Sequence, residues 1–540
     1  MNGMRTCKAA LAWAVLFGVA VPAGADVVTE WNTAALTSIR ATSMPPPRAA
    51  RALAILHAAI YDAVNGIART HEAYLVHRTV PASASMEAAA SGAAHRVLVM
   101  LIPARSTIFD AVHRQIVAGI RDTPQKSSGL VWGRLVADSL LATRANDGSD
   151  DVVLAPVTSA PGSWEPTPPA FAAYVLPQWG FVTPFAVPNI VDARPPGPPA
   201  LDSDRWSADY NEVNSLGAAT GSTRTGDQTQ IALFWADGAG TVTPPGHWNQ
   251  IAQQMGGALG NTLHENARLF ALLNLAMADA ATCAWEAKFA FNFWRPVTAI
   301  RYGDGDGNPN TEADRTWSSL IATPPFPDYV SGHSTFSGAA ATVLSRFYGT
   351  DNIAFVTGAD ATPGVYRSFA SFSAAAAEAA ISRLYGGIHF RSANDDGRRA
   401  GMAIGEYAFR NYLQPKTNRS RSKARNKEVS HDSAASNAST VGPDPLPDQP
   451  GGRASHWSCG APSFSPERSH RVPRRLRRAP LRDAWRRQCT YRAAAAATAP
   501  AGGRVSVSGS MDCGCHDKWS PDGRLLRWDR SREPESKHAG

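Results

Sequence analysis

The sequence predicts an all-α protein made of paired helical bundles, with its functional site inside the C-terminal bundle. Apolar residues recur at three- and four-residue spacing over residues 48–67, 86–102 and 128–147, the pattern of helices that bury one face. A second set of helical segments follows from about residue 207, and about 390 folded residues are enough to bury a large core. Facing helices of a bundle project side chains into the space between them, where a site can form.

Residues 1–25 are predicted to be a secretory signal peptide. Two basic residues precede the apolar stretch 9–21 and small residues fill positions 23–25, so cleavage is expected before Asp26. A short membrane anchor is the alternative. No later apolar run is expected to reach the roughly 18 residues that a membrane span requires. The chain is therefore predicted to be exported, to the periplasm or the extracellular space, without a membrane span.

The rest of the folded chain divides into three parts. Residues 26–151 form an N-terminal helical region, and residues 207–414 form a catalytic helical bundle. The segment 152–206 has repeated prolines, as in RPPGPP, and is predicted to be a long irregular connection. Long ordered loops over a site are often functional, and this one carries aromatic residues suited to the site entrance.

Residues 415–540 are predicted to be a basic, disordered tail, because helical periodicity is lost and 24 Lys and Arg stand against 12 Asp and Glu. The net charge of +8 therefore belongs to the tail, and the folded part is not expected to bind nucleic acid. The abrupt change of composition leads to the hypothesis that the tail is out-of-frame translation. That hypothesis requires an unbroken, matching continuation in another reading frame of the coding DNA.

Three cationic residues, Lys288, Arg295 and Arg383, indicate an anion-binding site. Lys288 and Arg295 lie seven residues apart, which places both on one face of a helix that ends or kinks at Pro296. Arg383 lies at the end of an Ala-rich helix that breaks at two glycines. The neighbouring residues are rich in Phe, Trp and Ala, so burying these cations without a charged partner would be costly. An oxyanion would supply that partner, and Arg can bind it through two parallel hydrogen bonds.

The triplet Ser331-Gly332-His333 is predicted to open a helix that continues to Gly349. A helix N-terminus offers unpaired N–H groups and the positive end of the helix dipole, so the Gly332 amide and the Ser331 hydroxyl can bind oxygens of the anion. His389 follows the break after the third helix. A histidine placed there can attack or coordinate the central atom of the anion.

These residues fall into three motifs, namely Lys288 with Arg295-Pro296, Ser331-Gly332-His333, and Ser382-Arg383 with His389. The three-part pattern resembles the signature of the superfamily that joins vanadium-dependent haloperoxidases with type 2 phosphatidic acid phosphatases and bacterial acid phosphatases. The signature is highly specific, and the resemblance covers roughly residues 225–412, with looser similarity back to about residue 30. One departure is Val330, where the usual second motif has proline; this loosens the turn and removes no ligand.

The resemblance implies a role for each motif residue. His389 would bind vanadium in a haloperoxidase, or be the phosphorylated nucleophile in a phosphatase. His333 would be the acid–base residue. The oxygens of vanadate, or of phosphate as a competing occupant, would be held by Lys288, Arg295, Arg383, Ser331 and the Gly332 amide. Vanadate and the phosphoryl-transfer transition state share shape and charge, so one pocket could serve either reaction.

Further matches favour the chloroperoxidase-like bacterial branch. Trp285 and Phe326 stand where that branch has an apolar halide pocket, and ordinary core packing is the alternative for both. Asp237 lies in a segment that also resembles the branch, and would orient a site Arg or His from behind. The leading hypothesis is a haloperoxidase that oxidises halide with hydrogen peroxide and passes the product to an organic acceptor.

Two other functions stay open. One is an acid phosphatase that cleaves a phosphate ester through a phosphohistidine at His389. The other is a phosphate- or vanadate-binding protein without activity, against which the pair of His389 and His333 argues. The halide, the organic acceptor and the oligomeric state are left open by the sequence.

A few residues are expected to be structural. Residues 304–312 alternate acidic and amide side chains and loosely suggest calcium, but Pro309 stands where an EF-hand loop needs glycine, which favours a solvated acidic loop. The folded part has one cysteine, Cys283, so it must rely on its core and not on disulfides. The residues expected to pack in the interior are His57, His95, His264 and Cys283.

Overall fold

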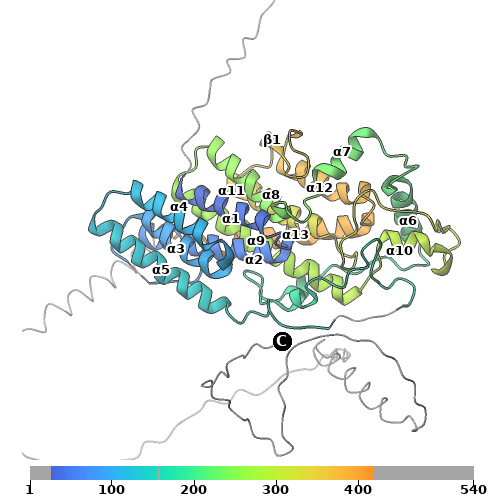
Figure 1. Ribbon diagram of the computed structural model, residues 1–540, viewed down its shortest axis with the longest axis horizontal. Coiled ribbons are helices and arrows are strands. Elements are labelled where there is room, and N and C mark those ends of the chain that lie inside the picture. The colour runs from blue at the N-terminus through green and yellow to red at the C-terminus, as the bar shows by residue number, and fades with distance from the viewer. Residues whose placement is uncertain (1–25, 79, 155–158, 417–540) are drawn as a thin grey trace, which may run out of the picture. The chain divides into compact units, whose positions relative to one another are not determined.

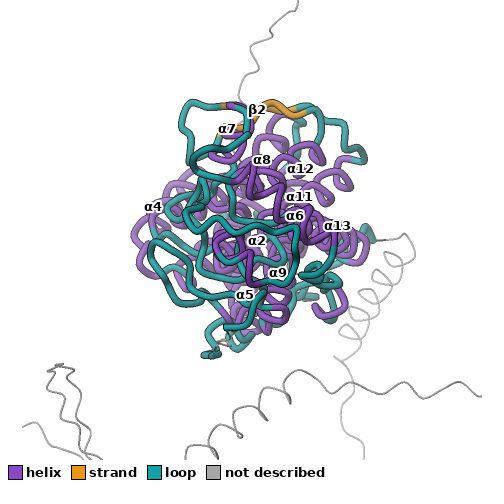
Figure 2. The backbone as a smooth tube through the Cα atoms, turned by 90° about the vertical axis from the view of Figure 1, so that its right-hand side faces the viewer, coloured by secondary structure: helices purple, strands orange, loops and turns teal. Residues whose placement is uncertain are grey.

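Two long helices, α2 (Pro46–Ala68) and α9 (Leu263–Phe291), form the centre of the protein, in a computed structural model that describes residues 26–78, 80–154 and 159–416. Figure 2 shows them side by side, and they share an extensive contact. α9 is buried on all its faces, as expected of a helix surrounded by others. Over the described residues the fold is all-α apart from one two-stranded hairpin, which confirms the predicted fold class.

The N-terminal half of the described chain is helical, as its apolar spacing predicted. Besides α2 it contains α1 (Val27–Ala41), α3 (Met86–Leu101), α4 (Ser106–Gly119) and α5 (Pro124–Arg144), with a 3₁₀ turn at Pro103–Arg105. Side chains cap several of these helices: Ser85 accepts a hydrogen bond from the Ala88 amide, and Thr123 accepts one from the Lys126 amide. α3, α4 and α5 pack together near α1 (Figure 1).

The C-terminal half carries the three motifs, and several of its helices pack against α9. In chain order its elements are α6 (Asp204–Gly217), α7 (Gly226–Phe234), α8 (Thr243–Ala258), α10 (Pro296–Arg301), a 3₁₀ turn at Gly303–Gly305, α11 (Gly332–Tyr348), α12 (Phe372–Tyr385) and α13 (Arg391–Asn411). α11 and α13 approach so closely at Gly401 that a Cβ added there would collide with the Thr335 carbonyl. The antiparallel hairpin of β1 (Phe355–Gly358) and β2 (Tyr366–Phe369) joins α11 to α12, with Phe355 opposite Phe369, and was not foreseen from the sequence.

The connection between α5 and α6 is irregular, as its prolines predicted. Within its described residues the regular elements are two 3₁₀ turns, Pro177–Phe181 and Ile190–Ala193. Gly180 lies so close to α9 that a Cβ there would come within 2.6 Å of the Glu286 Cα. The connection therefore packs directly on α9, two residues before Lys288.

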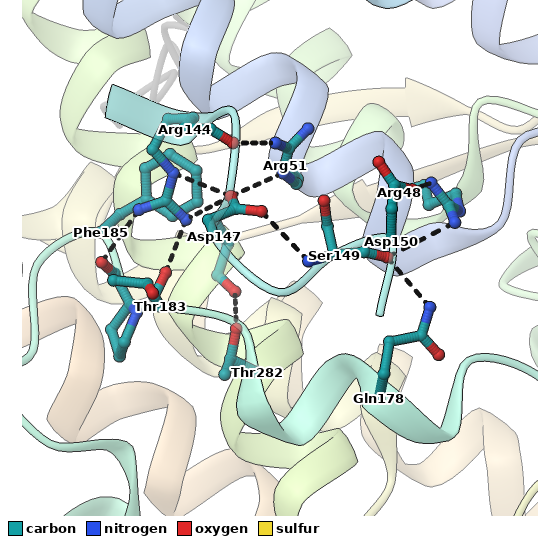
Figure 3. Close-up of polar contacts among 12 residues, drawn as sticks. Arg48, Arg51, Arg144, Asp147, Ser149, Asp150, Gln178, Thr183, Phe185 and Thr282 are labelled. Atoms are coloured by element: carbon teal, nitrogen blue, oxygen red, sulfur yellow. Dashed lines mark hydrogen bonds and ion pairs between the residues drawn. The ribbon is translucent and has the colours of Figure 1, made fainter. Parts of the chain in front are cut away.

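A buried cluster of charges attaches this connection to the N-terminal helices (Figure 3). Asp147 accepts hydrogen bonds from Arg144 at 2.9 Å and from Arg51 at 2.8 Å. Arg144 also donates to the Thr183 carbonyl at 2.5 Å, and its guanidinium carbon lies 3.7 Å from the centre of the Phe185 ring. Because each charge has a partner, the cluster can stay buried without a large desolvation penalty.

Asp279, in the middle of α9, holds the connection from the other side. Its carboxylate accepts the backbone N–H groups of Phe185, Ala186 and Val187 at 2.6, 2.7 and 2.8 Å. Burial raises the pKa of Asp279 to about 6, while the three N–H groups oppose that rise. The helix that carries Lys288 is thus tied to the segment that covers it.

Asp279→Ala is expected to lower the free energy of unfolding by about 3 kcal/mol, because three buried N–H groups lose their acceptor. Asp279→Asn should cost less, since its carbonyl oxygen can still accept. Urea unfolding of the three proteins followed by circular dichroism measures the difference. Equal stability of Asp279→Ala and the parent would show that the carboxylate does not anchor the connection.

α9 corrects one expectation from the sequence. The sequence was expected to contain no segment after residue 25 long and apolar enough to span a membrane, but α9 meets that criterion by length and composition. However, 94% of its most apolar 18-residue window is buried inside the protein. Apolar residues on all sides serve a helix in the middle of a bundle as well as one in lipid, so α9 is a core helix.

His57 lies in the interior, as expected, and stacks on Phe270 with ring centres 4.9 Å apart. Burial lowers the pKa of His57 to about 3, so the fold favours its neutral form. This contribution to stability is present above the unfolded-state value of 6.5 and is lost as the pH falls towards 3. We expect His57→Gln to lose less stability than the parent between these pH values, measured as Tm against pH. The control is His77→Gln, at an exposed position, which should lose as much as the parent.

Several other sequence expectations concern the chain ends and the acidic loop. The predicted signal peptide and all but the first two residues of the predicted tail lie outside the described residues. The last described residues are paired to the N-terminal half, since the Glu72 amide donates to the Gln414 carbonyl at 2.8 Å.

In the acidic loop, the Asp306 carboxylate accepts from the Trp206 indole and the Asn308 amide, both at 2.8 Å. Asp306 thus shapes the loop through its own hydrogen bonds.

Candidate active site

The first motif is split between two elements, which corrects the expectation that Lys288 and Arg295 share one helix face. α9 ends at Phe291, with Asn292 in the left-handed conformation as its C-cap, and Arg295 is the extended residue before α10. Pro296 is the first residue of α10 and therefore begins a helix instead of ending one. Lys288 and Arg295 still reach the same site, because the chain turns between them.

Lys288 is fully buried beneath the second motif. Its ammonium group donates to the carbonyls of Pro327 at 2.7 Å and Asp328 at 2.9 Å. Burial lowers the pKa of Lys288 well below its usual value; Arg295 lowers it further, while Asp328 opposes the change. A bound anion would favour the charged form and oppose this shift.

The two arginines are buried and only partly satisfied. Arg295 donates to the Phe326 carbonyl at 2.7 Å and the Ile388 carbonyl at 2.6 Å, but its Nη2 has no hydrogen-bond partner among the described residues. Arg383, on the last turn of α12, donates to the Trp235 carbonyl at 2.7 Å, and its Nε has no partner in the same part of the chain. Burial lowers the pKa of Arg295 to about 10 and that of Arg383 to about 9, so both stay charged at neutral pH.

Ser331-Gly332-His333 begins α11, as predicted, and the helix ends before a left-handed Gly349. Ser331 is the N-cap, and its hydroxyl oxygen accepts from the Ser334 hydroxyl at 3.0 Å, which leaves its own O–H free to donate. Gly332 is the first helical residue, where the backbone N–H has no partner within the helix. The two groups expected to bind anion oxygens therefore lie at the helix start.

His333 is partly exposed, and no residue that the structure describes makes a hydrogen bond to its Nε2. The ring faces the backbone carbonyls of Trp235 and Ala236, which raise its pKa. Burial and the charge of Arg383 act more strongly and lower the pKa of His333 well below its usual value. In this state the ring is neutral and can accept a proton.

His389 lies between the break after α12 and the start of α13, as predicted, and is buried. Its Nε2 lies 3.1 Å from Nη1 of Arg295. Its Nδ1 lies 2.9 Å from Oδ1 of Asp328, without the alignment of a hydrogen bond. Burial, followed by the charges of Arg295 and Lys288, lowers the pKa of His389 well below its usual value, so the ring is neutral.

Asp328 is the carboxylate of the site, and sequence reasoning missed it. It is fully buried, and burial raises its pKa to about 7, although Arg295 and Lys288 lower it. The signal available in the sequence was an acid inside FPDYVSGH, next to a triplet assigned to anion binding. A buried negative charge is costly unless positive charges lie beside it, so an acid at this position indicated a role next to the cations of the site.

Asp237 lies behind the site, where it was expected. Asp237 is buried, and its charge raises the pKa of Arg383 while burial lowers it. Its Oδ2 lies 3.2 Å from Nδ1 of His247. His247 in turn stacks on Trp235 with ring centres 4.6 Å apart. The segment of Trp235 to Asp237 therefore supports both Arg383 and His333, and the contribution of His247 was not foreseen.

Trp285 and Phe326 form an apolar wall on one side of Lys288. Their ring centres are 5.0 Å apart, and the Lys288 ammonium lies 5.0 Å from the Phe326 ring centre. A Cβ on Gly332 would be 3.4 Å from the Trp285 ring, so this wall also touches the start of α11. The pair is thus beside the cations, as a halide pocket requires, although the packing of two core aromatics would look the same.

The donors in this site suit a tetrahedral oxyanion such as vanadate or phosphate. Buried polar atoms of a folded protein nearly always have partners, yet within the described part of the chain the two arginines and His333 each leave a buried nitrogen without one. These atoms are Arg295 Nη2, Arg383 Nε and His333 Nε2. An anion with several acceptor oxygens would satisfy the two arginine nitrogens, the His333 Nε2 would be left for proton transfer, and the neutral His389 ring offers a nitrogen to the central atom of the anion.

Comparison with known proteins leads to the same family as the motifs. Residues 268–416 match the family model of the VCPO second helical-bundle domain. Vanadium chloroperoxidase from Curvularia inaequalis is 35% identical over 180 residues, which cover 28% of this chain and 29% of the relative. The alignment thus spans less than a third of that relative's length.

Solved structures extend the likeness over more of the chain. A bacterial vanadium-dependent iodoperoxidase superposes with a TM-score of 0.65 at 26% identity, covering 73% of this chain and 97% of that one. The holo form of a bacterial vanadium-dependent chloroperoxidase gives 0.55 at 19% identity, covering 68% and 92% of the two chains, and supports the fold alone. The resemblance seen in the three motifs is confirmed: the chain is similar to vanadium haloperoxidases, and its residues 268–416 match the VCPO second helical-bundle domain.

Proposed function

We propose that this protein is an enzyme that holds vanadate on His389 and oxidises a halide with hydrogen peroxide. The observation that carries the proposal is the convergence of unpartnered buried donors around a neutral histidine. The relatives named as vanadium chloroperoxidase and iodoperoxidase support the same chemistry. An anion-binding protein without activity would not need the acid–base group that His333 provides.

Bound vanadate would supply a metal centre that activates peroxide towards halide. Nε2 of His389 would bind the vanadium. The negative charge that develops on the oxygens would be stabilised by donors fixed in a site with little water, where such hydrogen bonds are strong. The groups assigned to the oxygens are Lys288, Arg295, Arg383, the Ser331 hydroxyl and the Gly332 amide.

His333 would move protons at the edge of the site. Its unpartnered Nε2 is free to accept a proton from peroxide, and the low pKa of the ring makes it a ready donor afterwards. Trp285 and Phe326 would exclude water from the halide beside Lys288. The relatives include both a chloroperoxidase and an iodoperoxidase, so the halide itself is a matter for measurement.

The test is a parallel assay of both chemistries that this pocket allows. The purified chain is loaded with orthovanadate and assayed for peroxide-dependent halogenation with chloride, bromide and iodide. The vanadate-free chain is assayed for phosphate-ester hydrolysis. Halogenation that depends on vanadate is expected. Hydrolysis alone, inhibited by vanadate, would contradict the proposal and identify a phosphatase with a phosphohistidine at His389.

We further propose that the protein is exported, with cleavage before Asp26. The first described helix supports this boundary, because the Asp26 side chain caps α1 by accepting the Thr29 amide at 2.9 Å. It also accepts from Asn266 of α9 at 2.8 Å. Mass spectrometry of the chain from an exporting host should find Asp26 at the N-terminus; an intact N-terminus would contradict cleavage.

A further inference from the structure

We propose that Asp328 is a positioning residue that fixes the tautomer of His389, with the proton on Nδ1, so that Nε2 keeps a lone pair with which it can bind the anion. This inference rests on the proposed function, because it concerns how His389 binds vanadium. Asp328 itself touches neither the anion nor the halide. It acts through the histidine ring.

The carboxylate of Asp328 lies beside the ring of His389. Oδ1 of Asp328 lies 2.9 Å from Nδ1 of His389, and both side chains are buried. Among the described residues the Phe390 backbone N–H also faces the carboxyl and lowers its pKa, but neither carboxylate oxygen makes a well-aligned hydrogen bond, and neither does the His389 Nδ1. The two groups therefore depend on each other, and contacts of this kind often align only when the ligand is bound.

The contact between His389 and Arg295 shows which side of the His389 ring carries the proton. Nε2 of His389 lies 3.1 Å from Nη1 of Arg295. A guanidinium can only donate hydrogen bonds, so Nε2 must be the acceptor. In a neutral ring the proton is then on Nδ1, which faces Asp328.

The backbone of Asp328 is held by the first motif. Its amide donates to the Phe293 carbonyl at 2.9 Å, and its carbonyl accepts from Lys288 at 2.9 Å. The carboxylate is thus fixed in place by the residues around Lys288 and Arg295, and is presented to the histidine of the third motif. One residue connects all three motifs.

The role has a definite chemical consequence. A histidine bound to a metal commonly donates its other ring N–H to a carboxylate, which fixes the ring and raises its basicity. Without Asp328, the proton can move to Nε2, where it would donate to an anion oxygen. The anion would still be attracted by the cations, but the bond from Nε2 to the central atom would be lost.

Two anions separate this role from a simple effect of charge. Vanadate accepts a bond from Nε2, whereas sulfate has similar shape and charge but is held only through its oxygens. Removing the Asp328 charge should strengthen the attraction of the cations for any anion. Only a positioning role predicts that vanadate binds more weakly while sulfate does not.

The experiment compares Asp328→Asn, which keeps the side-chain size, and Asp328→Ala with the parent chain. Affinities for orthovanadate and sulfate are measured by calorimetry, and the tautomer of His389 by nitrogen NMR of labelled histidine. We expect vanadate affinity to fall by about 10- to 100-fold in both variants. Sulfate affinity should be unchanged or higher, and the His389 signal should shift from the Nδ1-protonated to the Nε2-protonated form.

Asp62→Asn is the matched control, since Asp62 is another buried carboxylate that accepts backbone N–H groups in the N-terminal half, including that of Tyr74 at 2.7 Å. Equal changes for the two anions, or an unchanged tautomer, would overturn the inference about Asp328. Failure of the parent chain to bind vanadate would instead overturn the proposed function. Retained sulfate binding shows that the variant site is folded.

Discussion

His389→Ala is expected to abolish vanadate-dependent halogenation and any phosphate-ester hydrolysis together. The side chain is buried, its neutral ring offers Nε2 to the site, and no other histidine stands in that position in the described structure. The cations and the start of α11 would remain and could still attract an anion. The bond to its central atom would be lost, and removing a residue of this kind costs about three orders of magnitude or more in turnover.

The measurement is kcat for both reactions and the affinity for orthovanadate. His264→Ala is a suitable control, because His264 lies at the other end of α9 and is bound to the Thr70 hydroxyl at 3.0 Å. That variant should keep the parent activity. Substantial activity of His389→Ala in either assay would refute the assignment of His389.

His333→Ala is expected to lower kcat by about 100- to 10,000-fold while changing vanadate affinity much less. His333 has an unpartnered Nε2 at the edge of the site, and burial together with Arg383 keeps its pKa low. His333 can therefore accept and donate a proton without binding the anion itself. Removing it should affect the chemical step and leave the cations, Ser331 and His389 in place.

The two variants thus predict different patterns. His389→Ala loses binding and turnover, whereas His333→Ala loses mainly turnover, as kinetics and calorimetry on the same preparations can show. If His333→Ala lost vanadate affinity as strongly as His389→Ala, His333 would be a ligand and not the proton-transfer group. If its kcat stayed within a few-fold of the parent, another group would have to move the proton.

Much of this site could be predicted because residue types that begin and end helices mark its elements in the sequence. Ser331 is a good N-cap and Gly349 adopts the left-handed conformation that ends a helix, so both ends of α11 could be placed from residue type. The glycines after Arg383 likewise placed His389 beyond a break. These features depend on a few neighbouring residues, which a sequence shows directly.

The errors came from features that depend on tertiary structure. Asn292 ends α9 four residues before Pro296, where the sequence suggested that proline was the stop, because a left-handed Asn is a weaker signal. The burial that makes Asp328 unusual is set by Lys288, Arg295 and the surrounding helices together. The apolar length of α9 could be read correctly only once the helices around it were known.

The central claim is that the three motifs form one pocket in which His389 binds the vanadium. A crystal structure of the chain grown with orthovanadate tests it most directly. The account predicts vanadium at bonding distance from Nε2 of His389, with its oxygens contacted by Lys288, Arg295 and Arg383 and by the start of α11. Vanadate bound elsewhere, or an anion in the pocket without a bond to His389, would contradict the account.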